Sequence, residues 1–263
     1  MAPSRTLPSV RRDRIFTVIK DRQFARVTEI SSEFGISEVT VRSDLDHLER
    51  RGQIRRVHGG AVLDERPVRR ERSFEEQSEE SAADKLRIGR AAAEMVQSGQ
   101  TVLIDVGTTC RTVAQAIVDR TDLSDVNIVT NGLNIAAMFE PVTPQFTVVV
   151  TGGTIRPLQH SLVDPFGGPV LERLNADMMF LGCNGVHPTK GVTNVNLPEA
   201  EMKQRMIASA RRTIGVADGS KIGQVCVAWV CHIDQLDVLI TSSSAPEKER
   251  ELLLDRGLEI VFV

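Results

Sequence analysis

Long hydrophobic runs are missing from this sequence. The longest, such as Phe146–Val150, are far shorter than the roughly 20 residues that a membrane-spanning helix needs. The N-terminal residues MAPSRTLPSVRRDR also lack the apolar stretch of a secretory signal. We therefore expect a cytoplasmic protein. Internal repeats and low-complexity tracts are absent as well.

The cysteines are few and scattered, at positions 110, 183, 226 and 231. No pair has the spacing of a CxxC motif, so reduced core thiols are the favoured interpretation. A metal site at Cys226, Cys231 and His232 is the less favoured alternative, because these residues lie in an apolar stretch, VCVAWVCHI, that we expect to be buried. We expect neither a metal nor a cofactor.

Charge is distributed unevenly along the 263 residues. Residues 1–72 hold 16 Lys/Arg and 11 Asp/Glu, a net charge of +5, so residues 73–263 carry −8 of a total that is −3. A basic head on an acidic body suits a polyanionic partner for the head. An arginine-rich surface that is merely solvated is the alternative. The length fits a small domain followed by a larger one.

Periodicity near the N-terminus predicts three helices. Apolar residues recur at i, i+3 and i+4 in the segment 11–21, which is typical of an amphipathic helix. Thr28 can cap a second helix that ends at Gly35, and Ser37 can cap a third that ends near Gly52. We expect the third helix to bury Val41, Leu45 and Leu48.

Short extended segments follow the third helix. Segments 53–57 and 61–63 flank the turn His58-Gly59-Gly60, a pattern that predicts a two-stranded hairpin, or wing. Residues 64–83 are charged and nearly devoid of apolar periodicity, so we expect a linker that is helical in part. These patterns together predict a winged helix-turn-helix domain over residues 8–63.

The second helix of a helix-turn-helix enters the major groove of DNA with its N-terminal part. The residues expected to contact DNA there are Ser37, Glu38, Thr40, Val41, Arg42 and Ser43. Arg42 can make a bidentate contact to guanine. Phosphate or minor-groove contacts are expected from Arg55, Arg56 and His58 in the wing, and phosphate contacts from Arg11, Arg12 and Arg14. A three-helix module that binds protein, with Arg42 merely solvated, is the alternative.

From residue 84 the pattern becomes an alternation of helices and apolar strands. We expect helices over 84–97, 109–118, 132–139 and 198–212. We expect strands over 101–106, 127–130, 146–151, 177–182, 213–218, 238–242 and 259–263. Such alternation predicts an α/β domain over residues 84–263, with a mostly parallel sheet that is covered on both faces.

Polar turns that contain glycine follow several of the predicted strands. The turn 105–109, DVGTT, opens a helix, so its N–H groups and the helix dipole can bind an anion. Because ligands of open α/β sheets bind at the carboxyl ends of the strands, we expect one effector pocket there. Its candidate residues are Asp105, Gly107, Thr108, Thr109, Thr130, Asn131, Gly152, Gly153, Asn184 and Gly185. Ordinary turns are the alternative at each position.

Charged residues in the second half of the chain extend the candidate pocket. Glu199 and Lys203 are spaced i, i+4, so they can line the pocket or simply pair on a helix face. Lys221 follows the turn Asp218-Gly219-Ser220, where it can bind phosphate or remain solvated.

The stretch VTEISSEFGISEVTVRSDLDHLERRGQIRRVHGGAV, residues 27–62, resembles the head of the DeoR family of bacterial transcription regulators. The RVHGGA wing is especially specific to that family. The resemblance implies a helix-turn-helix over residues 25–44. This chain has Arg42-Ser43-Asp44 where the family usually has two arginines before the aspartate, a difference that bears on half-site preference.

Motifs of the body resemble the same family: DVGTT, VTNGLNIA, VTGGTIR, GCNGV, LPEAEMK and ADGSK. The family's effector domain is similar in fold to ribose-5-phosphate isomerase, so the resemblance implies a phosphorylated sugar or related metabolite as effector. It implies that Asp105, Gly107, Thr108 and Thr109 hold the phosphate or hydroxyls, with Lys203 and Lys221 near the pocket. The chain departs from the family pattern at Val163-Asp164-Pro165 and at Ile222.

The favoured hypothesis is a repressor of a carbohydrate-metabolism operon. It would bind operator DNA as a homo-oligomer, a dimer or tetramer, and respond to a phosphorylated sugar. A sugar-phosphate isomerase is one alternative; it needs a general base, for which Glu199 is a candidate without a convincing acidic partner. An activator or architectural protein without effector is another. Because a fold does not carry its chemistry with it, we expect no enzymatic activity.

Overall fold

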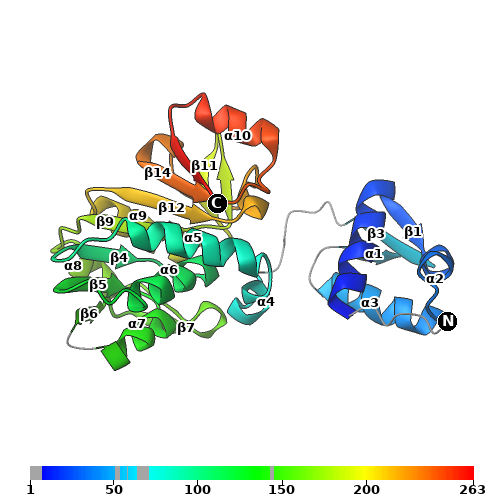
Figure 1. Cartoon of the computed structure of the whole chain (residues 1–263), viewed down its shortest axis with the longest axis horizontal. Helices are drawn as coiled ribbons and strands as arrows, with labels where there is room; N and C mark the ends of the chain where they lie inside the picture. Colours follow the sequence, from blue (N-terminus) through cyan, green and yellow to red (C-terminus); the bar gives the residue numbers. More distant parts are fainter. Residues whose placement is uncertain (1–7, 51–53, 58, 64–70, 143–144) are drawn as a thin grey trace. The chain divides into compact units, whose positions relative to one another are not determined.

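The computed structural model describes residues 8–50, 54–57, 59–63, 71–142 and 145–263. The chain splits into two compact units, Met1–Arg72 and Ser73–Val263, and each is described by itself (Figure 1). The second unit begins before the predicted boundary at residue 84, because helices α4 (Phe74–Ser78) and α5 (Ala82–Glu94) belong to it. Within the described residues, no helix is long and apolar enough to cross a membrane, and no three metal-ligating side chains gather.

The first unit packs three helices against a small antiparallel sheet. Its elements are α1 (Pro8–Arg22), β1 (Phe24–Arg26), α2 (Val27–Phe34), α3 (Glu38–Arg50), β2 (Ile54–Val57) and β3 (Gly60–Leu63). The strand order is β1-β3-β2, so the predicted wing hairpin gains a third strand, β1, that the sequence pattern did not indicate. The buried core contains the predicted apolar stripes: Ile15, Ile19, Val41, Leu45 and Leu48.

Two helix starts in this unit depend on local hydrogen bonds. Helix α2 begins before the predicted cap Thr28, because the N–H of Arg26 donates to the Glu29 carboxylate at 3.0 Å. The Ser37 hydroxyl accepts the N–H of Thr40 at 3.2 Å, so the predicted cap of α3 is confirmed.

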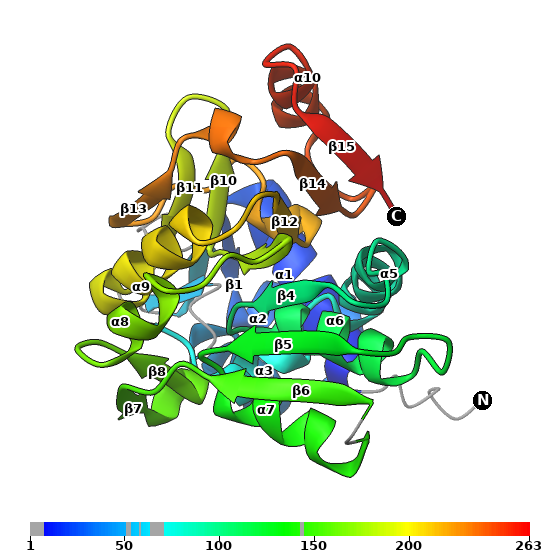
Figure 2. The same cartoon turned by 90° about the vertical axis from the view of Figure 1, so that its left-hand side faces the viewer.

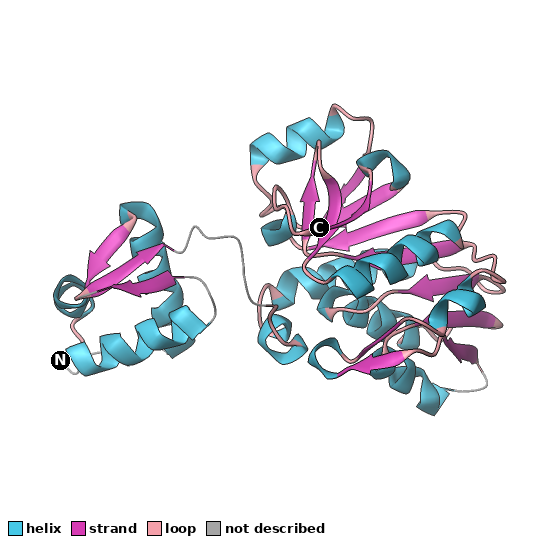
Figure 3. Cartoon of the chain, turned by 180° about the vertical axis from the view of Figure 1, so that it is seen from behind, coloured by secondary structure: helices cyan, strands magenta, loops and turns pink. Residues whose placement is uncertain are grey.

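The second unit is built on a seven-stranded sheet with the order β15-β14-β12-β9-β4-β5-β6. Its strands are β4 (Thr101–Ile104), β5 (Val126–Thr130), β6 (Phe146–Val150), β9 (Met178–Gly182), β12 (Thr213–Ala217), β14 (Val238–Thr241) and β15 (Glu259–Phe262). Every pairing in this sheet is parallel, which confirms the predicted α/β class. The alternation of strands and helices is visible in Figure 3.

Helices cover both faces of the sheet (Figure 2). On one face lie α5, α6 (Thr108–Val118) and α7 (Leu133–Phe139); on the other lie α8 (Gly167–Leu171), α9 (Leu197–Ala208) and α10 (Glu247–Leu254). Along β4, Val102 and Ile104 enter the first core and Leu103 enters the second, because successive side chains of a strand point to opposite faces. Because the seven strands are parallel, all of their carboxyl ends lie at one edge of the sheet.

Short strands that the sequence did not predict complete this unit. They are the hairpin of β7 (Thr154–Arg156) and β8 (Ser161–Val163), and an antiparallel sheet of β10 (Gly185–His187), β11 (Gly191–Asn194) and β13 (Ala228–Cys231). Because β13 is an outer strand of its sheet, the expected burial of VCVAWVCHI is wrong in part. Val225, Val227 and Trp229 are exposed, whereas Ala228 and Val230 are buried.

Candidate functional site

The DVGTT turn joins β4 to the N-terminus of α6. Asp105, the first residue of the turn, is fully buried. Gly107 precedes the helix with φ 116° and ψ 164°, a conformation that glycine adopts without strain. Thr108 and Thr109 form the first helical turn. The N–H groups of this turn and the helix dipole favour an anion at this point.

A buried ion pair connects this turn to α9. Lys203 is 3% exposed and Asp105 is 0% exposed, and the Lys203 ammonium donates to the Asp105 carboxylate and, at 3.1 Å, to the Gly182 carbonyl. The N–H of Gly182 donates to the same carboxylate oxygen at 3.0 Å. The structure therefore pairs Lys203 with Asp105, and not with Glu199 as the i, i+4 spacing suggested.

Burial and charge act against each other in this pair. Burial raises the pKa of Asp105 above its ordinary value, although the Lys203 ammonium opposes the shift. Burial also disfavours the charge on Lys203, but the carboxylates of Asp105 and Glu199 outweigh it and raise the pKa of Lys203. The ammonium is therefore charged at neutral pH, and it compensates the buried carboxylate.

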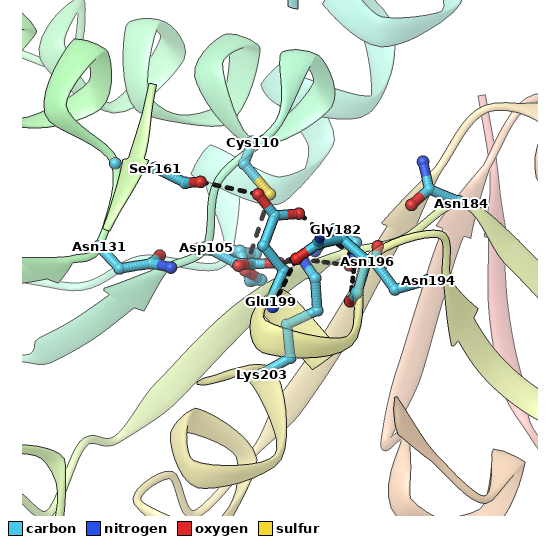
Figure 4. A network of polar contacts seen from close by, with 12 residues as sticks. Asp105, Cys110, Asn131, Ser161, Gly182, Asn184, Asn194, Asn196, Glu199 and Lys203 are labelled. Carbon is cyan, nitrogen blue, oxygen red and sulfur yellow. Dashed lines mark hydrogen bonds and ion pairs between the residues drawn. The ribbon is translucent and has the colours of Figure 1, made fainter. Parts of the chain in front are cut away.

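Glu199 forms the centre of a second polar cluster beside this pair (Figure 4). Its carboxylate lies 2.7 Å from an Arg156 nitrogen, accepts the Ser161 hydroxyl at 2.7 Å, and accepts the Asn194 amide at 3.3 Å. The Glu199 side chain is only 6% exposed and that of Arg156 17%. Sequence reasoning missed Arg156 and Ser161, which come from the β7–β8 hairpin.

Two buried acceptors at the carboxyl ends of β4 and β5 have no hydrogen-bond partner within the described residues. They are Oδ1 of Asp105 and Oδ1 of Asn131, on side chains that are 0% and 1% exposed. The Asn131 amide nitrogen donates to the Leu162 carbonyl at 3.2 Å, which fixes the orientation of its oxygen. Because buried acceptors are nearly always satisfied, these two oxygens indicate a donor supplied from outside the chain.

Other predicted pocket residues have structural partners. The Thr130 hydroxyl accepts the N–H of Gly132 at 3.0 Å, and Asn184 accepts the N–H of Val195 at 3.1 Å. In Figure 4, Asn184 lies apart from the cluster around Glu199. A Cβ atom at Gly153 or Gly185 would lie 2.2 Å or 2.5 Å from a backbone carbonyl oxygen, so packing within the protein accounts for both glycines.

Lys85 is a buried cation that sequence reasoning missed. It is 3% exposed, and its ammonium donates to the Gln77 carbonyl at 2.6 Å. Burial lowers the pKa of Lys85 to about 8, while Asp218 raises it and Lys221 lowers it. These side chains therefore lie within electrostatic reach of one another. The helical periodicity could have predicted the burial of Lys85, because Lys85 occupies the buried stripe of α5, three residues before Ile88.

The four cysteines are free thiols. Burial raises the pKa of Cys183 and of Cys231 to about 12, and raises that of Cys110 well above its ordinary value. Each of these three thiols therefore stays protonated, and unreactive as a nucleophile, at neutral pH.

The residues predicted to contact the major groove lie on α3 and its cap. Arg42 and Ser43 are exposed on this helix and Glu38 is partly exposed, whereas Val41 is 0% exposed and belongs to the core. The prediction that Val41 contacts DNA is therefore wrong. Val39, which the prediction omitted, is 73% exposed, and its methyl groups suit an apolar contact to thymine.

Arginines of α1 have a structural partner in place of phosphate. Asp44 is 1% exposed and accepts bonds from Arg11 at 2.6 Å and from Arg12 at 3.0 Å. The expectation that Arg11 and Arg12 dock on phosphate is corrected, because their guanidinium groups tie α1 to α3. Arg14 lies over the Phe34 ring, with 5.4 Å from its guanidinium carbon to the ring centroid.

Arginines of the wing and of α3 take part in exposed ion pairs. Arg56 is paired with Asp46, and its N–H donates to Glu49 at 2.6 Å. Arg42 lies 2.8 Å from Glu38 at i, i+4, with both side chains about half exposed. Such pairs are weak in water, so they leave Arg42 available to DNA. Arg55 is exposed on β2, and the predicted contact His58 lies outside the described residues.

A helix-turn-helix head joined to a parallel α/β domain with a polar site at its strand ends defines a ligand-sensing DNA-binding regulator. The model of the DeoR-like helix-turn-helix domain matches residues 11–67, and that of the DeoR C terminal sensor domain matches residues 80–243. The chain belongs to the DeoR family of transcription regulators. This membership places the chain among the regulators and not among the isomerases, and Glu199, the candidate base of the isomerase alternative, is bound by Arg156 and Ser161.

Curated relatives match along almost the whole chain. The HTH-type transcriptional regulator GlpR of Haloferax volcanii is 34% identical, covering 97% of this chain and 98% of that protein. The putative aga operon transcriptional repressor of Escherichia coli O157:H7 is 32% identical, covering 97% and 94%. Among solved structures, ribose 5-phosphate isomerase A from Methanocaldococcus jannaschii matches with a TM-score of 0.39 and 15% identity, over 52% of each chain.

Proposed function

We propose that this regulator is a repressor of a carbohydrate-metabolism operon, whose affinity for DNA is set by a phosphorylated sugar or polyol. The buried unpaired oxygens of Asp105 and Asn131 carry the proposal. Sugar hydroxyls are the donors that these acceptors need, and hydrogen bonds of this kind give a pocket its specificity. The names of two relatives, the aga operon repressor and the glycerol-3-phosphate regulon repressor of Escherichia coli, agree with such a role.

The phosphoryl group would bind at the N-terminus of α6. The N–H groups after Gly107, the hydroxyls of Thr108 and Thr109, and the ammonium groups of Lys85 and Lys221 are the groups that suit it.

We propose that the regulator acts as a homo-oligomer. Each chain carries one helix-turn-helix head, and such heads read two half-sites of an operator as a symmetric pair. A ligand changes DNA affinity only if it binds one arrangement of the oligomer better than another. A coupling of about 1–3 kcal/mol would change DNA affinity roughly 5- to 150-fold.

The proposal is tested with ribose 5-phosphate, fructose 6-phosphate and sn-glycerol 3-phosphate, each beside its unphosphorylated form. A true effector raises the melting temperature of the protein and changes its affinity for a fragment of its own promoter at constant salt. Unphosphorylated sugars serve as controls. A panel that neither stabilises the protein nor alters DNA binding would exclude a sugar-phosphate effector.

The exposed side chain of Arg42 carries the first specific prediction. Replacing Arg42 by Ala is expected to weaken operator binding about 5- to 150-fold, because a bidentate contact to guanine contributes about 1–3 kcal/mol. Binding to random DNA should change much less. The control is Arg22→Ala, since Arg22 is also an exposed arginine in an ion pair, with Glu33. Equal losses in both variants, measured by fluorescence anisotropy, would rule out base reading by Arg42.

The lowered pKa of Lys85 predicts how effector binding depends on pH. The ammonium is charged below about pH 8 and neutral above it, so affinity for a phosphorylated effector should be constant near pH 7 and fall as the pH rises through 8. Between pH 7 and 9.5 the phosphate itself stays dianionic. Calorimetric titration of wild type against Lys85→Met measures the effect. A wild-type affinity that is flat up to pH 9.5 would remove Lys85 from the phosphate site.

A further inference from the structure

Helix α4 is the first element of the second unit, and only residues 64–73 separate it from β3 of the DNA-binding head. It has five residues, too few for a helix to be stable by its own hydrogen bonds. A capping box at Ser73 and Glu76, with bonds of 3.0 and 3.2 Å, organises its first turn. Contacts with the rest of the unit must therefore hold the helix in place.

The N-terminal contact of α4 is made with His160, which lies between β7 and β8. Phe74 is buried, and its ring meets the His160 ring edge-on, with centroids 5.4 Å apart. The Glu75 carboxylate lies 2.9 Å from Nε2 of the same ring. The next residue, Ser161, donates to Glu199 at 2.7 Å. His160, which contacts α4, is thus the immediate neighbour in sequence of Ser161, which belongs to the cluster around Glu199.

The C-terminal contact of α4 is made with Lys85. The Lys85 ammonium donates to the Gln77 carbonyl at 2.6 Å, and this carbonyl also accepts the N–H of Glu80 at 3.2 Å at the end of the helix. The same ammonium is within electrostatic reach of Asp218 and Lys221 at the end of β12. Both ends of α4 are therefore held by groups that adjoin the candidate effector site.

We propose that α4 transmits effector binding to the DNA-binding head, and that Phe74, Glu75 and His160 are positioning residues for this step. An effector that draws Ser161 or Lys85 towards itself weakens the contacts of α4. The helix then shifts or unwinds, which changes the point from which the chain leads to the head. This inference rests on the proposed function, because it concerns the regulation of the same site.

Amide hydrogen exchange of the full-length protein tests this connection without any ligand. Ser161→Ala removes the hydroxyl that binds Glu199 and leaves His160 and all side chains of α4 unchanged. We expect amides of residues 75–80 to exchange about fivefold faster in this variant, the change that one lost hydrogen bond makes in an opening equilibrium. The control is Ser209→Ala, which removes bonds to Leu171 and Arg205 behind α9. Unchanged exchange in α4 of Ser161→Ala would overturn the proposal.

A second measurement separates transmission from binding. In His160→Ala, the sugar phosphate that stabilises the wild type is expected to raise the melting temperature by the same amount. That sugar phosphate should, however, no longer change the affinity of the variant for DNA. The matched control is His187→Ala, because the His187 ring accepts hydrogen bonds from the turn of Thr189 and Lys190, away from α4. A full DNA response in His160→Ala would contradict the inference. If no sugar phosphate stabilises the wild type, the proposed effector fails, and the exchange experiment still decides the role of α4.

Discussion

Lys203→Met is expected to lower the free energy of unfolding of the second unit by about 3–5 kcal/mol, the cost of removing one partner of a buried ion pair. Methionine fills nearly the same volume, so the loss reports charge and not a cavity. The Asp105 carboxylate, 0% exposed, would lose its charged partner and keep the Gly182 N–H as a donor. The change is measured by urea denaturation of the full chain, monitored through a spectroscopic signal from the second unit.

The pH dependence of this variant gives an independent check. Burial already raises the pKa of Asp105, and loss of the ammonium raises it further, so the folded state binds a proton more tightly than the unfolded state. The destabilisation of Lys203→Met should therefore shrink as the pH falls. Asp105→Asn combined with Lys203→Met should recover most of the stability. The exposed Lys190→Met is the control, and a similar small loss in both lysine variants would show that the pair contributes little.

Apolar periodicity was sufficient to predict the helices of the head. Ile15 and Ile19 on α1, and Leu45 and Leu48 on α3, enter the core as the 3.6-residue period requires. The same pattern should have excluded Val41 from the DNA contacts, because a residue on the buried stripe cannot also face the groove. What periodicity could not provide was the partner of Asp44, since the ion pairs with α1 join residues more than 30 positions apart.

Parallel strands explain why the closeness of two candidate site residues was predictable. Once alternating strands and helices indicated one parallel sheet, every turn after a strand had to lie at one edge, which brings Asp105 and Asn131 together. The pairing of charges was not predictable in this way. Lys203 meets Asp105 across 98 positions of sequence, and the i, i+4 spacing to Glu199 concerns only neighbours on one helix.

The β7–β8 hairpin was missed for a different reason. Its strands have three residues each, too few for an alternation of apolar and polar residues to be visible. The hairpin nevertheless supplies Arg156 and Ser161 to the Glu199 cluster. Two glycines precede it, and only the second, Gly153, packs closely against β8.

Gly153→Ala is expected to be the most disruptive substitution in this hairpin. Its φ of +127° is strained for alanine, which costs about 1–3 kcal/mol. The new Cβ would also lie 2.2 Å from the Val163 carbonyl oxygen, and such overpacking costs about 1–3 kcal/mol more. To relieve the contact β7 must move away from β8, which withdraws Arg156 from Glu199. We therefore expect loss of effector response as well as a loss of roughly 2–6 kcal/mol.

The neighbouring Gly152 offers a matched control. It also has a positive φ, +79°, but no heavy atom lies within 4 Å of the position that a Cβ would take. Gly152→Ala should therefore cost only the left-handed backbone strain, about 1–2 kcal/mol, and should keep the effector response. Denaturation and thermal-shift measurements on both variants separate the two effects. If both variants lose stability equally, the close approach to Val163 does not hold the hairpin in place, and another contact must position Arg156.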